Sequence, residues 1–239
     1  MTIYRSPPYL DQIAHGWKSY MGFPYVEDDR GQYASPYGYP GVEDMSLIPA
    51  IREALGKPLF IRHAVLYQGP GIAHPTRMMP LKDPWTATTR AELRHAHTRS
   101  VVAHQEPSTT DSLSHFKREY LVCMKRKCAA AKHMALVDNL ESLAGHQQVV
   151  LITTPGASSI FLLDPQDGLA HYHLSYKQVG AHNLAMAAIM GTAAEVMCAR
   201  GMTRIHLGGG MSKDPADPLM SFKARWGRDE HTVYFQTIP

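Results

Sequence analysis

The sequence contains neither a long hydrophobic run nor a strong excess of one charge. Among its 239 residues no apolar window reaches the length of about 18 residues that would suggest a membrane-spanning helix. The N-terminus also lacks a basic segment followed by an apolar run and a small-residue cleavage site. We therefore expect a soluble cytoplasmic protein without membrane contact.

Cysteine is scarce as well. Cys123, Cys128 and Cys198 are the three cysteines, and no two of them form a C-x-x-C pair. This pattern excludes a disulfide framework and the usual cysteine zinc site. Cys123 and Cys198 fall in apolar helical patterns, so we expect both in the core. No carboxylate or cysteine has the spacing to complete a metal site with His171 and His173, so we expect no metal.

The formal net charge of +3 is too small to indicate a nucleic-acid partner, but the positive charge is unevenly distributed. Residues 77–99 hold five Lys/Arg against two acidic residues, and residues 117–132 hold six against one. Both segments are compatible with a polyphosphate partner and equally with a solvated helix face. The sequence leaves these two alternatives open.

The length of 239 residues and the apolar content of 44% are sufficient for one or two domains. We expect residues 1–110 to form a partly irregular N-terminal segment, a partial lobe that completes the sheet and the substrate cleft. It contains a short helix at 47–55, a strand at 59–67, and a poorly periodic stretch up to about residue 110.

Residues 111–239 have a much clearer pattern. We expect helices from residue 112 and over 132–143, strands at 149–153, 159–163 and 169–176, a helix at 179–199, a strand at 203–207, a helix at 218–225 and a strand at 232–238. This is the element order of the acetyltransferase (GNAT) fold, an α/β fold with a mixed central sheet flanked by helices.

Several short motifs resemble the FemAB-like branch of the GNAT superfamily. They are TRIHLGGG at 203–210, DPLMSFKARWG at 217–227, HYHLS at 171–175, the aromatic helix with Tyr120, Met124 and Arg126, and SPYGYPG at 35–41. The resemblance implies transfer of an acyl group to an amine. FemAB-type enzymes take an aminoacyl group from aminoacyl-tRNA. Complete FemAB ligases have two GNAT-like halves, whereas one complete half fits here, so binding of a cell-wall precursor is in doubt.

The donor is inferred from the turn before the long helix. GNAT enzymes that use acetyl-CoA hold its pyrophosphate on an Arg/Gln-x-x-Gly-x-Gly/Ala turn. Here the turn reads KQVGAHN at 177–183, in which His182 replaces the last small residue. We therefore expect no coenzyme A and no other cofactor, with a divergent CoA enzyme as the alternative.

An aminoacyl-tRNA donor requires basic surface for an RNA stem and a polar, aromatic slot for the terminal adenosine. The two basic segments and the Tyr37 and Tyr39 pair are compatible with that, although these aromatics could equally be core or turn residues. The expected acceptor is the amine of a small molecule or of a peptide intermediate, free or carrier-bound, as in peptide-antibiotic-like metabolism.

Acyl transfer develops negative charge on the carbonyl oxygen, so a cation placed there is often the largest catalytic contribution. By resemblance, Lys223 is the candidate for this cation, with a surface lysine as the alternative. His173 or His206 could accept the proton of the incoming amine, or be structural. Arg126 is expected on the groove side of its helix, bound to a phosphate or carboxylate, or in an exposed ion pair. The full set of expected substrate-binding residues is Tyr37, Tyr39, Arg126, Tyr172, Ser175, Gly209 and Phe222.

A non-catalytic GNAT-like binding module is the alternative of a different class. The altered turn at 177–183 favours it, and the intact signature with Lys223 opposes it.

Overall fold

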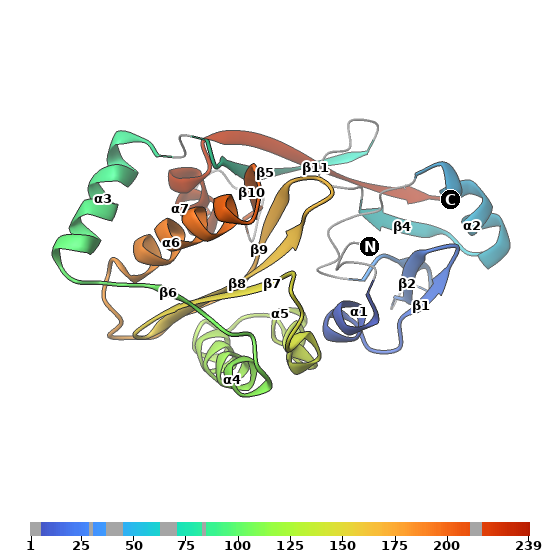
Figure 1. Cartoon of the computed structure of the whole chain (residues 1–239). Coiled ribbons are helices and arrows are strands. Elements are labelled where there is room, and N and C mark those ends of the chain that lie inside the picture. Colours follow the sequence, from blue (N-terminus) through green and yellow to red (C-terminus); the bar gives the residue numbers. More distant parts are fainter. Residues whose placement is uncertain (1–5, 29–30, 37–44, 63–70, 83–84, 211–216) are drawn as a thin grey trace.

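The computed structural model describes residues 6–28, 31–36, 45–62, 71–82, 85–210 and 217–239. These residues form one mixed sheet of 11 strands, with helices on both faces (Figure 1). The strand order is β1-β2-β3-β4-β11-β5-β10-β9-β8-β7-β6. Within the described residues, no helix combines the length and the apolar character that crossing a membrane requires.

The C-terminal part has the element order expected from the sequence. The order is α4, α5, three antiparallel strands, α6, β10, α7 and β11, which confirms the mixed α/β fold with GNAT element order. The bounds are α4 Thr110–Arg126, α5 Ala131–Ala135, β7 Val149–Thr154, β8 Ala157–Asp164, β9 Leu169–Lys177, α6 Ala185–Ala199, β10 Arg204–Gly208, α7 Pro218–Trp226 and β11 Asp229–Ile238.

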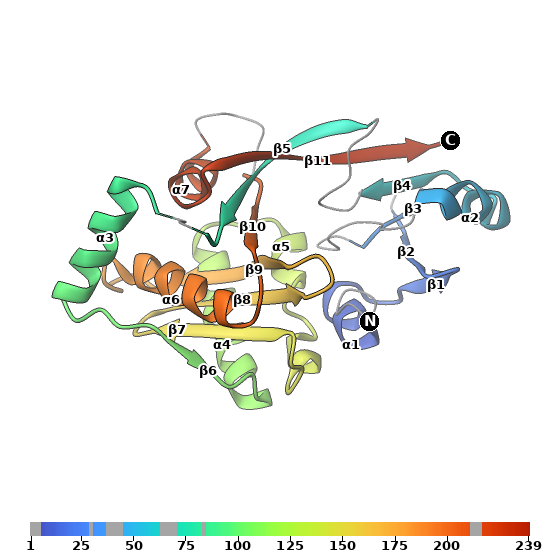
Figure 2. The same ribbon diagram turned by 45° about the horizontal axis from the view of Figure 1, so that its top comes forward.

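The core on one face of the sheet lies under the long helix α6. Helix α6 is apolar on most sides, and the face that it turns toward the strands is almost completely buried. Ile205 and Leu207 of β10, Phe161 of β8 and Trp226 of α7 belong to the same apolar cluster. Figure 2 shows α6 lying across the strands, with α3 and α7 on the same side.

A second core covers the opposite face. The amphipathic helix α4 places Leu113, Phe116, Tyr120 and Cys123 against Ile160, Leu162, Leu174 and Tyr176 of the sheet. Helix α1, Pro7–Ile13, and the short 3-10 helix η3, Leu140–Leu143, complete this layer. The two basic segments therefore lie in different layers, since α3 accompanies α6 whereas α4 is on the other face (Figure 1).

The N-terminal part of the chain contains more helices and strands than the one helix and the one strand that the sequence predicted. Helix α2 confirms the predicted helix, and the strand predicted at 59–67 is described as β4 up to Arg62. The bounds of these two elements are α2 Ile48–Leu55 and β4 Leu59–Arg62. The sequence did not predict the other elements, which are α1, β1 Lys18–Tyr20, β2 Phe23–Glu27, β3 Tyr33–Ala34, η2 Met45–Leu47, β5 Ile72–Pro80, α3 Ala87–Thr98 and β6 His104–Glu106. Strand β5 lies inside the sheet, between β11 and β10, so this segment is part of the fold's centre.

Three smaller expectations also need correction. The helix predicted at 132–143 is two short helices, α5 and η3. The helix predicted at 179–199 begins only at Ala185, because the preceding residues form the turn after β9. Cys198 is exposed rather than buried, since it lies on the solvent side of the last turn of α6, where Met197 is the residue that faces the core, whereas Cys123 is in the core as expected.

Candidate functional site

The candidate site begins where the two parallel strands β9 and β10 stop pairing. Their register runs from Leu169 and Arg204 to His171 and His206, and no pair follows. Strand β9 continues to Lys177 with β8 as its partner, while β10 ends at Gly208. The predicted residues of the Gly triplet and of HYHLS therefore border the place where the two strands separate.

Lys223 is the buried cation of this site. It lies on α7, whose first turn is fixed by Asp217, since the carboxylate of Asp217 accepts hydrogen bonds from the amides of Leu219 and Met220. Lys223 is only 7% exposed, and its Nζ donates a hydrogen bond of 2.6 Å to the carbonyl oxygen of Gly209. Burial lowers the pKa of Lys223 to about 8, with the carboxylate of Asp217 opposing and Arg62 adding to the decrease.

The three residues Gly208, Gly209 and Gly210 need to be glycine, because of the backbone conformation at Gly208 and because neighbouring side chains lie very close to the backbone of Gly209 and Gly210. Gly208 has a φ of +74°, in the left-handed region that favours glycine. A Cβ on Gly209 would lie 2.6 Å from Nε2 of His74, and a Cβ on Gly210 would lie 2.9 Å from the carboxylate of Asp217. The absence of side chains therefore lets His74, Asp217 and Lys223 close around the end of β10.

His206 is buried beside this end of the strand. It is 3% exposed, and within the described part of the chain its Nε2 has no hydrogen-bond partner. Its ring lies edge-on to His171 at 5.4 Å and to His231 at 6.2 Å between centroids. Burial holds the pKa of His206 well below its usual range, and His171, Arg62, His231 and Lys223 add to this effect. His206 is therefore a neutral imidazole at pH 7.

Arg62 and His74 belong to the same site, although no motif in the sequence indicates either residue. Arg62 pairs with Phe235 across β4 and β11, and its guanidinium lies 5.8 Å from the centre of the Phe235 ring. The His74 ring is edge-on to Phe235 at 6.0 Å and adjoins Gly209. These residues come from β4, β5 and β11, far from the Gly triplet in sequence, so no local motif connects them.

The predicted residues on β9 divide between the two faces of the sheet. Tyr172 donates a hydrogen bond of 2.5 Å to Oγ of Ser175, and the Tyr172 ring packs on Phe161 in the layer of α6. His173 lies on the other side, where its Nε2 is 3.1 Å from Oε1 of Gln12. A register shift in the pairing of β8 with β9 leaves His173 without a cross-strand partner.

His173 is thus held by helix α1 and has no contact with Lys223. Its ring is 5.8 Å from that of Tyr9, and burial lowers the pKa of His173 to about 4. The same cause lowers the pKa of His171 to about 3. Among the predicted proton acceptors, only His206 lies near the lysine.

The other predicted site residues are farther from this centre or are not described. Arg126 is exposed at the end of α4, because α4 places Cys123 and not Arg126 toward the sheet. Phe222 is half-buried and packs against the core under α6. Tyr37 and Tyr39 lie outside the described residues.

The turn between β9 and α6 differs structurally from a pyrophosphate cradle. Nδ1 of His182 accepts the amide hydrogen of Leu184 at 3.1 Å, so this side chain occupies the start of α6. Beside the turn is a hollow of about 540 Å³, lined by His95, Thr98, Arg99, His182, Asn183 and Leu184. It joins the basic end of α3 to the start of α6.

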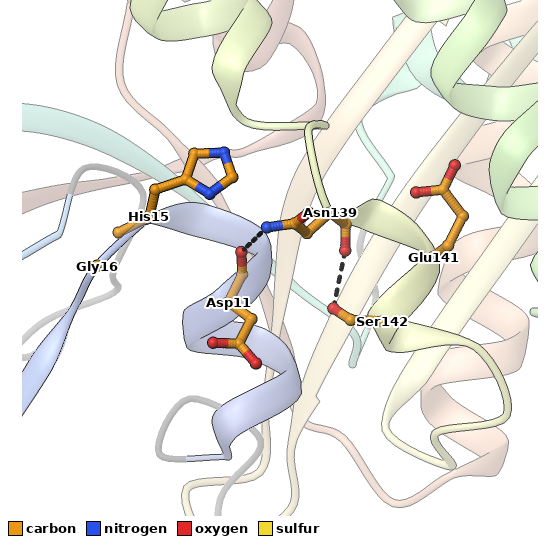
Figure 3. Close-up of a pocket in the computed structure, with 7 residues that line it drawn as sticks. Asp11, His15, Gly16, Asn139, Glu141 and Ser142 are labelled. Atoms are coloured by element: carbon orange, nitrogen blue, oxygen red, sulfur yellow. Dashed lines mark hydrogen bonds between the residues drawn. The ribbon is translucent and has the colours of Figure 1, made fainter.

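A second hollow, of about 420 Å³, lies between α1 and η3 (Figure 3). Nδ2 of Asn139 donates to the carbonyl oxygen of Asp11 at 2.7 Å, and Oγ of Ser142 donates to the carbonyl oxygen of Asn139 at 2.8 Å. The first of these hydrogen bonds connects α1 to the layer of α4, and none of the predicted site residues lines the hollow. In the described residues no group of three or more His, Cys, Asp or Glu side chains is placed to hold a metal ion.

No known protein family and no curated protein sequence matches the chain. Solved structures do share its fold. The C-terminal DUF2156 domain of a candidate lysylphosphatidylglycerol synthetase from Agrobacterium fabrum has a TM-score of 0.66 at 12% identity, covering 99% of this chain and 88% of that one. L-PGS from Bacillus licheniformis has a TM-score of 0.60 at 12% identity, covering 97% and 91%.

FemX has a TM-score of 0.53 at 13% identity, covering 82% of this chain and 70% of that one. At these identities the similarity establishes the fold alone. In the comparisons with the two synthetase-type structures, the shared fold includes nearly all of residues 1–110 of this chain.

Proposed function

We propose that the protein is an aminoacyl transferase, which takes its acyl group from aminoacyl-tRNA and passes it to the amine of a small molecule or peptide intermediate. The observation that carries the proposal is the buried Lys223 at the end of β10, held on the carbonyl of Gly209. It stands in the motif that resembles FemAB-type enzymes, and the chain shares the fold of FemX and L-PGS. A role in specialised metabolism stays part of the proposal.

The chemistry assigns Lys223 an electrostatic role. The acceptor nitrogen forms a bond to the ester carbonyl carbon, and negative charge develops on the carbonyl oxygen. The ester bond then breaks, the ribose hydroxyl of the tRNA leaves, and the proton lost by the amine is taken up by that leaving oxygen. A buried ammonium stabilises both oxygens more strongly than an exposed one, because little water competes with it.

His206 is the candidate for carrying the proton. Its imidazole is neutral and buried, so it can accept a proton from the acceptor and return it to the leaving group. His173 is less well placed, because Gln12 and Tyr9 fix it on the side of α1.

The turn before α6 supports tRNA rather than coenzyme A as the donor. In an acyl-CoA enzyme the amides at the start of this helix bind the pyrophosphate. Here the ring of His182 occupies that place and accepts the amide hydrogen of Leu184. Pyrophosphate binding would require this side chain to leave.

The basic hollow beside the same turn fits an RNA backbone. Arg99 and His95 at the end of α3 face His182 across it, and Arg90 and Arg94 are exposed on the same helix. Beyond the turn, on the side of α4, Cys123 donates to the carbonyl oxygen of Lys177. This contact brings the exposed basic end of α4 to the same edge of the sheet, where both basic segments can meet one polyanion.

A release assay with charged tRNA pools tests donor and chemistry together. The acceptor panel contains simple amines, short peptides and, because two similar structures are of the lysylphosphatidylglycerol synthetase type, phosphatidylglycerol. We expect acyl transfer that depends on acceptor and on Lys223. Transfer from acyl-CoA instead of aminoacyl-tRNA would contradict the proposal that aminoacyl-tRNA is the donor. If the protein bound neither donor, the alternative of a non-catalytic binding module would be favoured.

A further inference from the structure

Strand β6 forms one edge of the sheet. The strand order ends with β6, which lies outermost beside β7 (Figure 2). Within the described residues no strand pairs with its other side. An edge strand of this kind presents N–H and C=O groups that can pair with another chain. The edge is distant in the sheet from the strand that ends at the Gly triplet, since β7, β8 and β9 lie between β6 and β10.

The unpaired backbone groups of β6 are arranged symmetrically about Gln105. The strand pairs with β7 over residues 104–106, with Gln105 at the centre. In an antiparallel ladder alternate residues bond to the same neighbour, so either Gln105 or both His104 and Glu106 direct their N–H and C=O groups away from β7. In both cases a second β6, antiparallel to the first and with Gln105 opposite Gln105, meets these groups with its own.

The side chains complement one another in the same register. When the two Gln105 residues are opposite, His104 of each copy lies opposite Glu106 of the other. Cross-strand partners share a face and are close enough to interact, so imidazole and carboxylate can form a hydrogen bond at both places. Among the residues that the structure describes, neither His104 nor Glu106 has a side-chain hydrogen bond or an ion pair. Both side chains are therefore available to a second copy.

The surroundings of β6 leave its edge accessible. His104 and Gln105 are exposed, and Glu106 is half-buried. Gln105 also lines a hollow of about 730 Å³ that lies between β6, the start of β7 and the end of α6, so the space beside the strand is open there. Val102, two residues before the strand, is 65% exposed. A chain that pairs with β6 would cover this apolar side chain.

The other end of the strand order does not have this complementarity. The edge strand there is β1, and all three of its residues are exposed. A pair of β1 strands centred on Ser19 would place Lys18 opposite Tyr20 and would bring no opposite charges together. Only the β6 edge is matched by its own side chains.

We propose that two copies of this chain associate through β6, antiparallel across a two-fold axis at Gln105, so that the sheet continues from one copy into the other. Both copies use the same surface, as is usual for symmetric dimers. Three residues on each side make a small contact, so the dimer is reversible and its fraction increases with concentration. The association does not depend on the proposed function.

Sedimentation equilibrium over a series of protein concentrations tests the association with the full chain. For the wild type we expect the apparent mass to rise from the chain mass of 26.6 kDa toward twice that value. His104→Glu places a carboxylate opposite Glu106 of the second copy at both pairs, so the dissociation constant should increase by about tenfold or more. Lys18→Glu changes a charge on the exposed β1 edge and is the matched control, which should associate as the wild type does.

A mixture of two variants tests the register itself. Glu106→Lys places an ammonium opposite His104, so this variant alone should associate more weakly than the wild type. When it is mixed with His104→Glu, the new carboxylate of one chain lies opposite the new ammonium of the other, and the remaining Glu106 lies opposite the remaining His104. We therefore expect heterodimers from two variants that associate poorly by themselves. Loss of folding cannot produce this result.

A cross-link provides a measurement that does not depend on charge. In a chain that carries Cys128→Ser and Cys198→Ser, Gln105→Cys places two thiols opposite each other at the axis, at a separation that a disulfide spans. Mild oxidation should link the two copies, whereas Ser19→Cys in the same background should stay unlinked.

The proposal is overturned if the wild type keeps the mass of a single chain at every concentration, or if His104→Glu associates as the wild type does. It is also overturned if the mixed variants form no heterodimer, or if Gln105→Cys and Ser19→Cys are linked equally.

Discussion

Nζ of Lys223 and the carbonyl oxygen of Gly209 are 2.6 Å apart, so this buried ammonium is directed at the end of β10 by a backbone group. The lysine arrives from α7 and the carbonyl from a strand of the central sheet. The position of the Lys223 ammonium therefore depends on how α7 packs, and also on the glycines that let the side chain approach the strand.

Replacing Lys223 should remove most of the activity. For Lys223→Met we expect turnover to fall by about a hundredfold or more, the scale for losing one donor to a developing oxyanion. The measurement is the single-turnover rate with saturating aminoacyl-tRNA. Lys57→Met is the control, because Lys57 is a half-buried lysine that precedes β4 and pairs with Glu27. Near-normal turnover in a folded Lys223→Met protein would reject the catalytic role.

The pH profile should show which form of Lys223 is active. With a pKa of about 8, the side chain is an ammonium below that pH and an amine above it. If the cation stabilises the oxyanion, the rate should decrease as pH rises through about 8. Lys223→Arg should keep part of the activity and lose that decrease, since arginine stays charged. A rate that instead increases through pH 8 would make Lys223 a base.

Gly209→Ala should damage both stability and activity. Its Cβ would lie 2.6 Å from Nε2 of His74 and 2.9 Å from the carbonyl oxygen of Pro75. Overpacking of this kind costs about 1–3 kcal/mol. The free energy of unfolding in urea gives the value, and the pair Gly209→Ala with His74→Ala should recover part of it. An unchanged unfolding midpoint in the single variant would show that the strand end is not closely packed.

Acid should destabilise the protein through its buried histidines. The pKa values of His171 and His173 are lowered to about 3 and about 4, so between those values and about 6.5 the unfolded chain binds protons that the folded chain does not. Stability should therefore be complete above pH 6.5 and fall progressively below it. Urea unfolding at a series of pH values measures this, and His173→Gln should flatten the dependence. A curve that is level from pH 7 to pH 4 would argue that these histidines are protonated in the folded protein.

Arg99 should contribute to donor binding. Arg99→Gln is expected to raise the KM for aminoacyl-tRNA and to reduce the salt dependence of binding by about one unit of slope, as for one lost phosphate contact. Arg52→Gln on α2, also exposed but far from the basic hollow, is the control. Equal effects of the two substitutions would indicate that the hollow has no special role.

The sequence predicted the C-terminal half of the fold well, because its hydrophobic periodicity and turn residues are unambiguous. The resemblance also pointed to Lys223 and the Gly triplet, which lie in one short segment and which the structure brings into contact. The N-terminal elements could not be predicted, because their structure depends on the sheet: the exposed first half of β5 is fixed by pairing with β11, and α3 by packing on α6. Local sequence does not contain that information.

Arg62 and His74 were missed for the same reason. Each is an ordinary residue of a strand with no motif around it, and only the order of strands brings them to Gly209 and His206. For Arg126 the sequence left a groove-side and an exposed position open, because helical spacing is consistent with more than one inward face until a partner surface is known. His182 shows the opposite case: its place in the turn was seen in the sequence, but its capping hydrogen bond required the structure.

The position of β11 between β4 and β5 also constrains how the chain acquires its shape during synthesis. All other strands of the sheet leave the ribosome before β11 does. Strands β4 and β5 must therefore wait, with unpaired edges, for a partner that is translated last. We expect nascent chains stalled before Asp229 to be sensitive to proteases in β4 and β5, because only the final strand closes the sheet over the site.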